Sequence, residues 1–453
     1  MLTWAAEELR FADLGDIRRN RRLMKIVEDL AAQPNASVPE ASGDWAATKA
    51  AYEFWKSPRI SADSIRTAAE KSTIERIRSH KIVLAIQDTT QLDLDHHPGT
   101  SGLGPTSHPE ILGLMVHSTM AATPEGVPLG ILDQIVWARE PDTVGKRHTR
   151  RQRDIQDKES QRWLTALATT QALVPQEVTV VTVADREADI YDLFVAPRPA
   201  NAHLLIRVDH NRKVDHEAQY LQEAMRQVAP CGQLTLELQA TEHRSARTAT
   251  LTVRFATLAV QPPRHHPQRA KLKPVLVQFV LVEEENPPKG ETPIHWLLLT
   301  TLPVTSFSDA LGCVRSYTYR WLIERYHYVL KSGCRIEQLQ LETASRLEKA
   351  LATYSIVAWR LLWLTYQARV HPDTPCDTIL EAHEWQSLYC TIHHTTTPPA
   401  QPPSLHQAVR WIAKLGGFLG RKSDKEPGVK TIWRGMRRLH DIAKTWQLIY
   451  SGS

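Results

Sequence analysis

Three acidic residues, far apart in this sequence of 453 residues, have the side chains that a divalent-metal site requires. Asp88 follows the apolar run IVLAIQ and Asp185 follows VTVVTVA, so each is the first acid after a predicted buried strand. Because α/β folds place their chemistry at the carboxyl ends of strands, both carboxylates are candidates for one site. The acids that compete with them for this role are Asp93, Asp95, Glu187 and Asp189.

The third acid, Glu324, belongs to the stretch YTYRWLIERYHYVLKSG at residues 317–333. At about 100° per residue, a helix over this stretch would place Tyr317, Arg320, Glu324 and Lys331 within an arc of about 60°. The opposite side of the predicted helix is apolar and should face the core. It carries Leu322, Ile323, Tyr326, Val329 and Leu330. A solvated charged face is the alternative explanation of the polar stripe.

Three carboxylates that converge on one point repel one another unless a cation lies among them. Mg²⁺ favours oxygen ligands, so a set of two Asp and one Glu suits Mg²⁺, or Mn²⁺ in its place. Two such ions can activate a nucleophile and stabilise the leaving oxygen of a phosphodiester. Arg320 and Tyr317 can hold phosphate oxygens beside the metals, and Lys331 can bind the next phosphate. These residue types predict phosphoryl transfer on nucleic acid.

The distribution of charge favours the same kind of partner, although the net charge is only +5. Three basic patches are present, RRNRR at residues 18–22, GKRHTRRQR at 145–153 and PPRHHPQRAKLKP at 262–274. Each alone is compatible with an ordinary solvated surface. Several in one chain favour a phosphate backbone as partner, because each neutralised phosphate releases counterions.

Other features exclude several classes of protein. No run of 18 apolar residues and no signal-peptide pattern is present, so we expect a cytoplasmic protein without a membrane partner. The five cysteines form no C-x-x-C pair, which argues against a zinc ribbon and suits a reducing compartment. The histidines show no metal-ligand spacing.

The elements that must position these residues follow from the hydrophobic pattern. Residues 1–75 predict a helical module, and residues 76–200 predict strand, strand, strand, helix, strand. Residues 201–304 predict short strands that form an all-β insertion. Residues 305–370 return to helices, one of them buried on all sides, and residues 371–453 predict a C-terminal helical domain. The predicted fold class is therefore α/β, a mixed sheet flanked by helices, with helical domains at both ends.

The residues singled out above match a known family pattern. The pattern Y-x2-R-x3-E-x6-K, formed by Tyr317, Arg320, Glu324 and Lys331, resembles the signature of DDE transposases of the insertion sequence 4 family. Four further segments are similar to that family, AIQDTT at 85–90, ADREADI at 184–190, ENPPKGETPIHWLLLT at 285–300 and LGDIRRNRRL at 14–23. The likeness extends from the N-terminus to about residue 370 and is weaker beyond it.

The resemblance implies an RNase H-like catalytic core that a β-domain interrupts between the second Asp and the Glu. It implies cut-and-paste transposition in a bacterial nucleoid: nicking at inverted-repeat ends, a DNA hairpin intermediate, hairpin opening, and joining of the 3′-hydroxyl ends to target DNA. By matching position, Asp88, Asp185 and Glu324 would be the catalytic triad that holds two Mg²⁺ or Mn²⁺ ions.

The resemblance also implies how the protein would hold DNA. Tyr317, Arg320 and Lys331 would bind phosphates around the hairpin, and Trp296 would stack on a flipped base. The residues that match the segment recognising double-stranded transposon ends are Arg18, Arg19, Arg21 and Arg22. The C-terminal helices would hold two protomers together as a homodimer on DNA.

The sequence departs from the family at several places. Leu114 and Met115 stand where the resembled transposases carry a Trp pair, the basic patch at 145–153 replaces an acidic stretch, and the C-terminal third diverges. End-sequence specificity and dimer geometry are therefore not carried over.

Three alternatives stay open from the sequence. An RNase H-like metal-dependent nuclease would cleave DNA without a hairpin product. A catalytically silent DNA-binding regulator is disfavoured because all three acids are present. A glycosidase with paired carboxylates would not need the arginines, lysines and basic patches.

Overall fold

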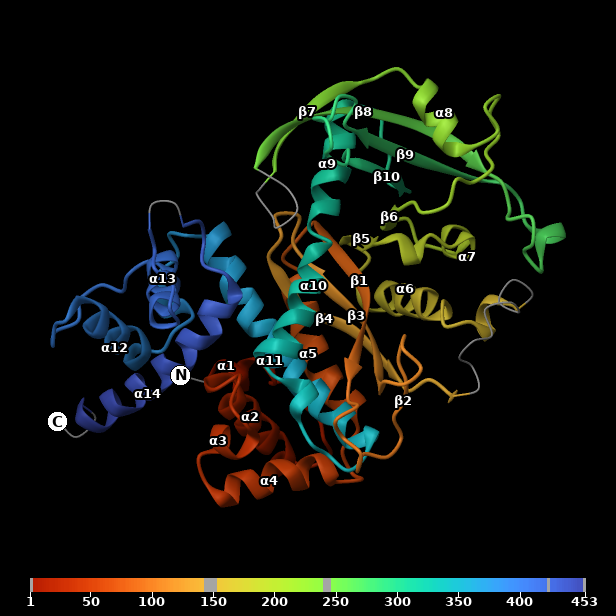
Figure 1. The fold of residues 1–453 in the computed structure, drawn as a ribbon. Helices are drawn as coiled ribbons and strands as arrows, with labels where there is room; N and C mark the ends of the chain where they lie inside the picture. The colour runs from red at the N-terminus through yellow and green to blue at the C-terminus, as the bar shows by residue number, and fades with distance from the viewer. Residues whose placement is uncertain (1–2, 142–152, 239–245, 422–423, 451–453) are drawn as a thin grey trace. The chain divides into compact units, whose positions relative to one another are not determined.

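The structure is a computed structural model that describes residues 3–141, 153–238, 246–421 and 424–450. The chain forms two compact units (Figure 1). Unit 1 contains residues 1–79, 89–144 and 322–453, and unit 2 contains residues 80–88 and 145–321. Most of the basic patch at 145–153 lies outside the described residues. In the part of the chain that the structure describes, no helix is long and apolar enough to cross a membrane.

Unit 1 contains the helices of both ends of the chain and a small sheet. Its helices are α1 (Trp4–Glu8), α2 (Ile17–Ala32), α3 (Val38–Ser42), α4 (Trp45–Lys56), α5 (Ala62–Ile77), α10 (Trp321–Tyr328, from its second residue), η6 (Val329–Gly333), η7 (Ile336–Gln338), α11 (Ala344–Val370), η8 (Cys376–Thr378), α12 (Ala382–His393), α13 (Leu405–Leu415) and α14 (Val429–Tyr450). Its strands are β2 (Gly104–Pro105), β3 (Leu112–Ala122), β4 (Pro128–Trp137) and the later part of β1 (Ile82–Asp93).

Unit 2 contains the larger part of the sheet and the helices on it. Its helices are η3 (Ile155–Asp157), α6 (Gln161–Leu173), η4 (Arg186–Ala188), α7 (Tyr191–Val195), α8 (Leu221–Gln227), η5 (Arg269–Lys271) and α9 (Phe307–Thr318). Its strands are the first part of β1, β5 (Thr179–Ala184), β6 (Ala202–Arg207), β7 (Gly232–Leu238), β8 (Arg247–Val260), β9 (Val275–Glu283) and β10 (His295–Thr300).

The helical modules predicted at the two ends are confirmed, and local sequence explains their helices. In α2, Leu23, Ile26, Val27 and Leu30 are buried at helical spacing, and the Asp16 carboxylate caps the first turn by accepting from the Arg18 N–H. The all-apolar helix predicted over 345–368 is the buried α11. In the C-terminal domain, α13 and α14 approach closely at two glycines, because a Cβ on Gly435 would lie 1.8 Å from the Ile412 carbonyl oxygen.

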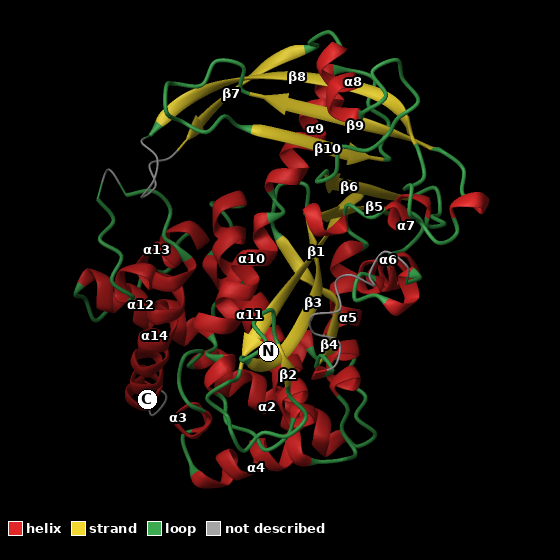
Figure 2. Cartoon of the chain, turned by 45° about the vertical axis from the view of Figure 1, so that its right-hand side comes forward, coloured by secondary structure: helices red, strands yellow, loops and turns green. Residues whose placement is uncertain are grey.

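The predicted order of strand, strand, strand, helix, strand is also confirmed, by β1, β3, β4, α6 and β5. In unit 2 the strands follow the order β1-β5-β6-β10-β9-β8-β7 (Figure 2). The first three are parallel, and β6 and the strands after it pair antiparallel. This mixed α/β fold is consistent with an RNase H-like core that carries terminal helical domains.

The segment predicted as an all-β insertion, residues 201–304, consists mainly of strands but also includes a helix. The segment contains α8, and its first strand, β6, pairs in parallel with β5. One hydrophobic core joins Trp163 of α6 and Phe194 of α7 to Val260, Phe279 and Leu299 of the later strands. The strands of this segment therefore extend the sheet that contains β5. Short strands in a sequence do not reveal their partners, because pairing is decided by packing.

The prediction of one helix over 317–333 is also wrong. The helix α9 ends at Thr318, where the N–H of Tyr319 and the N–H of Arg320 each donate to the carbonyl three residues earlier. A second helix, α10, begins at Trp321 and continues as a π-helical turn, in which the Cys334 N–H donates to Val329 O at 2.7 Å. Both changes alter the rotation per residue, so one helical wheel cannot describe the stretch. The predicted apolar side is nevertheless buried throughout.

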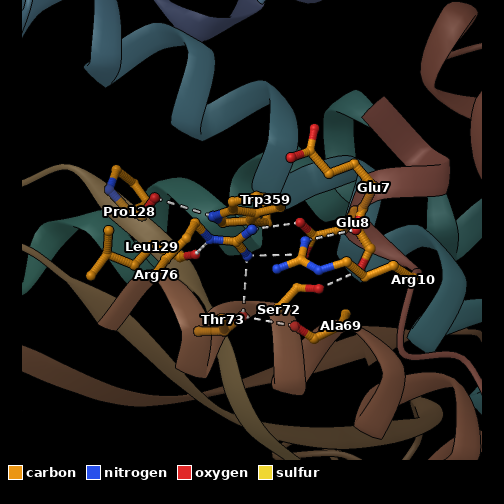
Figure 3. A network of polar contacts seen from close by, with 10 residues as sticks. All are labelled: Glu7, Glu8, Arg10, Ala69, Ser72, Thr73, Arg76, Pro128, Leu129 and Trp359. Atoms are coloured by element: carbon orange, nitrogen blue, oxygen red, sulfur yellow. Dashed lines mark hydrogen bonds and ion pairs between the residues drawn. The ribbon is translucent and has the colours of Figure 1, made fainter. Parts of the chain in front are cut away.

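A buried ion pair joins the first helix of unit 1 to the rest of that unit (Figure 3). Arg76 of α5 donates to both carboxylate oxygens of Glu8, at 2.6 and 2.9 Å, and to the Leu129 carbonyl at 2.6 Å. Its guanidinium lies 4.2 Å from the ring centre of Trp359 in α11. Burial raises the pKa of Glu8, and the hydrogen bond from Arg76 opposes that shift. Arg76 therefore links α1, α5, β4 and α11.

Candidate active site

Strand register in unit 2 indicates where Asp88, Asp185 and Arg207 lie relative to one another. The parallel register on β1 and β5 has its last matched pair at Ile86 and Val183, and continued by two residues it would match Asp88 with Asp185. On β5 and β6 the last matched pair is Ala184 and Ile206, and the next would be Asp185 and Arg207. The two predicted Asp therefore follow paired segments of neighbouring parallel strands, toward the carboxyl ends of that pairing.

The two Asp reach this position differently. Asp185 directly follows β5, as predicted, and caps η4 by accepting from the Glu187 N–H at 2.9 Å. Asp88 does not end its strand, because β1 continues to Asp93. Its pairing with β5, however, has its last matched residue at Ile86. Asp88 therefore lies two residues beyond the last matched pair, inside a longer strand.

The competing acids of unit 2 have structural partners. Glu187 is exposed and forms an ion pair with Arg162 at 2.7 Å. Asp189 is buried, where it accepts from Arg212 at 2.6 Å and from the backbone N–H of Asp209 and of His210 at 2.8 Å each. Asp189 thus holds the chain after β6 in place. Both observations favour Asp185 as the chemical carboxylate after β5.

The other two competing acids, Asp93 and Asp95, lie in unit 1 and are exposed. The Asp93 carboxylate accepts from the backbone N–H of Asp95 at 3.1 Å, and its own N–H donates to Glu337 at 3.0 Å. These contacts shape the turn that follows β1.

Tyr317, at the end of α9, lies on one face of the sheet beside Trp296 of β10. Leu297 and Leu299 of β10 belong to the core under α6 to α8, so the alternating Trp296 and Leu298 point to the other face, where α9 packs. Trp296 meets Tyr317 edge to face, with ring centres 5.7 Å apart. Tyr317 is buried, whereas the alternative explanation of the polar stripe as a solvated face would require it to be exposed.

The electrostatics of Tyr317 reflect this packing. Burial raises the pKa of the phenol, the guanidinium groups of Arg320 and Arg207 lower it, and the Asp185 carboxylate raises it. Arg320 is itself buried, with its guanidinium 4.7 Å from the Trp321 ring centre. Tyr317, Arg320 and Asp185 are therefore close enough to influence one another within unit 2.

Arg207 is a member of this cluster that sequence reasoning missed. Its guanidinium donates to the His295 carbonyl at 3.2 Å, and it is close enough to Tyr317 to lower the pKa of that phenol. Burial lowers the pKa of the Arg207 guanidinium. The sequence did contain a signal for Arg207. It is the polar residue that ends the apolar run HLLIR, much as Asp185 is the polar residue that follows VTVVTVA.

The remaining members of the predicted stripe lie in unit 1. Glu324 is half-buried in the first turn of α10. Lys331 lies in the π-helical turn, where its ammonium donates to Gln91 O at 2.9 Å and pairs with Glu337 at 3.1 Å. Their predicted roles as metal ligand and phosphate ligand stay predictions.

The candidate site contains donors of the type that a hard divalent metal ion prefers. Asp88 and Asp185 offer carboxylate oxygens, a donor type that suits Mg²⁺ or Mn²⁺. Among the described residues, no group of three or more His, Cys, Asp or Glu is arranged to hold a metal ion. A metal site completed by Glu324 stays a prediction.

The predicted end-binding arginines lie on the first turns of α2. Arg18, Arg21 and Arg22 are exposed, whereas Arg19 is half-buried and donates to Leu14 O at 2.8 Å. The side chain of Arg18 is 86% exposed beside its partner Asp16. Three of the four are thus available to a partner molecule.

Comparison with known families agrees with this placement. Residues 1–60 match the family model described as transposase DNA-binding. Residues 356–449 match the model described as transposase Tn5 dimerisation domain. The two matches support a Tn5-like DNA transposase that binds DNA and dimerises, so the resemblance found in the sequence is confirmed at this level. The assignment to the insertion sequence 4 family stays a prediction.

Proposed function

We propose that this protein is a cut-and-paste DNA transposase that cleaves the ends of its own element through a hairpin intermediate. The observation that carries the proposal is the parallel register of β1 and β5, which would match Asp88 with Asp185 if continued by two residues, in the chain between the two matched segments. Paired carboxylates at the carboxyl ends of parallel strands suit phosphodiester chemistry. The arginines on α2 would recognise the inverted-repeat ends.

Asp88, Asp185 and Glu324 would hold Mg²⁺ or Mn²⁺, and a bound divalent ion would activate the nucleophile and stabilise the leaving oxygen. Arg320 would hold a phosphate oxygen through its guanidinium, and the Tyr317 hydroxyl would donate to another. In each step an oxygen nucleophile forms a bond to phosphorus while the bond to the leaving oxygen breaks. The nucleophile is water in the first nick and the freed 3′-hydroxyl in hairpin formation.

The proposal is tested with the purified full chain and a linear duplex that contains the DNA flanking its gene. With Mg²⁺ or Mn²⁺ we expect a nick at the element end, followed by a hairpin that migrates at double length on a denaturing gel. A chelator should remove both products. Cleavage at the same ends without a hairpin would indicate the nuclease alternative. Binding without cleavage under either metal would contradict an active enzyme and favour the regulator.

The hairpin step has a residue-specific prediction in Trp296. Replacing its ring by Ala should reduce hairpin formation by about 10- to 100-fold, because stacking of a base on an aromatic ring contributes roughly 1–3 kcal/mol. The first nick should continue at the parental rate, since it needs no flipped base. Both products are measured over time on one denaturing gel.

Trp296→Phe serves as the matched control for this variant. It retains an aromatic face beside Tyr317 and should restore most of the hairpin yield. An unchanged hairpin yield in Trp296→Ala would remove the stacking role.

A further inference from the structure

The connection between β8 and β9 is a strongly basic segment that the proposed function does not use. This segment, residues 261–274, is called the β8–β9 loop below. It contains four arginines and lysines, Arg264, Arg269, Lys271 and Lys273, two histidines, and no Asp or Glu. Figure 1 shows it leaving the ends of β8 and β9.

The charges of the β8–β9 loop differ from those of the neighbouring strands. In this part of unit 2, arginines of the strands and of α8 are paired with acids: Arg247 with Glu284, Arg254 with Glu285, and Arg226 with Glu283. In the loop, all four arginines and lysines are exposed. Among the described residues, the loop's ion pairing is limited to His266 with Asp192. On the neighbouring strands and α8, acids pair with the arginines, whereas the loop presents four exposed cations and contains no acid.

The β8–β9 loop is anchored by contacts with α7. The Tyr191 hydroxyl donates to the Lys273 carbonyl, and His266 Nε2 lies 3.0 Å from Asp192 Oδ1. Leu272 packs against the core of unit 2, and residues 269–271 form a helical turn. A basic surface held in this way loses little conformational entropy when it binds a partner.

The chain connection limits how far the anchor of the β8–β9 loop can lie from Asp185. Asp192 follows Asp185 by seven residues, which span at most about 25 Å of extended chain. One turn of duplex DNA is about 34 Å long. A duplex with a phosphate at Asp185 could therefore meet this anchor within about one turn.

We propose that the β8–β9 loop binds the phosphate backbone of duplex DNA through Arg264, Arg269, Lys271 and Lys273. Four closely spaced cations without acids suit a polyanion, and their flexible side chains suit phosphates rather than base edges. The contact is therefore independent of base sequence. The position of that DNA beside Asp185 rests on the proposed function, whereas duplex binding by the loop does not.

The test uses the full chain with the triple variant Arg264→Gln, Arg269→Gln and Lys271→Gln. Binding to a short duplex of arbitrary sequence is measured by fluorescence anisotropy over a series of salt concentrations, without divalent metal. If all three side chains contact phosphates, the slope of log K against log salt should become shallower by about 2.7. At about 0.1 M salt the affinity should fall about tenfold or more.

The matched control removes three charges from other exposed positions of unit 2, Lys81→Gln, Lys289→Gln and Arg315→Gln. It should bind nearly as the parent does. An equal loss in both triple variants would assign the effect to net charge and overturn the proposal. An unchanged slope in the loop variant would also overturn it, and would turn attention to an acidic protein as partner. Circular dichroism checks that both variants fold.

Cleavage by the parent protein separates this inference from the proposed function. If the parent cleaves the element ends and the loop variant binds duplex normally, the inference alone fails. If the parent does not cleave but the loop variant loses duplex binding, the proposed function fails and the backbone contact stands.

Discussion

Asp185→Asn is expected to lower metal-dependent cleavage of the element ends by about a thousandfold or more while leaving DNA binding intact. A divalent ion contributes several kcal/mol to such a reaction, and each 1.36 kcal/mol corresponds to about tenfold in rate. The asparagine keeps the size of the side chain and an oxygen that can cap η4. Initial rates are measured on a denaturing gel, and binding is measured separately by anisotropy.

Glu187→Gln is the matched control for this prediction. Glu187 lies two residues after Asp185, is exposed, and pairs with Arg162. Because exposed pairs contribute about 0–1 kcal/mol, its loss should change the rate by less than about fivefold. A large defect in Glu187→Gln together with near-parental activity in Asp185→Asn would reverse the assignment of the catalytic carboxylate.

Arg76→Met is expected to destabilise the protein by about 3–5 kcal/mol, because it leaves the buried Glu8 carboxylate without its partner. The Glu8 side chain is only 6% exposed, so water does not replace the lost hydrogen bonds. The variant also loses the contact with Trp359 and the bond to the Leu129 carbonyl. The measurement is the midpoint of thermal or urea unfolding of the full chain.

The pH dependence of this defect has a definite sign. Without Arg76, burial raises the pKa of Glu8 in the folded state above its unfolded value of 4.5, against the smaller opposing effects of Arg360 and Arg10. A raised folded pKa favours the folded state at low pH, and this contribution is lost as the pH rises through the folded pKa. The difference between Arg76→Met and the parent should therefore be smaller near pH 5 than near pH 8.

Two further variants show whether the buried pair is responsible. Arg78→Met removes an exposed arginine just after the same helix and should change stability by less than about 0.5 kcal/mol. Adding Glu8→Gln to Arg76→Met removes the buried charge and should recover part of the lost stability. A double variant as unstable as the single one would show that packing against Trp359 matters more than the charge.

Local pattern was sufficient for most elements of the fold. The runs IVLAIQ and VTVVTVA predicted β1 and β5, and the spacing of Leu23, Ile26, Val27 and Leu30 suits the helix α2. These predictions succeed because the buried side of a strand or of an amphipathic helix is visible as a regular spacing of apolar residues along a short stretch of sequence. The prediction over 317–333 failed because a helical wheel assumes one helix axis and one number of residues per turn. In this stretch the chain ends one helix, begins another and finishes in a π-helical turn.

The sequence by itself determined the residue types that could do chemistry and the strands and helices that carry them. Tertiary structure alone decided that β1, β5 and β6 pair in parallel just before Asp88, Asp185 and Arg207, and that Asp189 is held by Arg212. The register between strands depends on how α6 to α8 and the later strands fill a common core. That packing is a property of segments distant in the chain, so no local pattern records it.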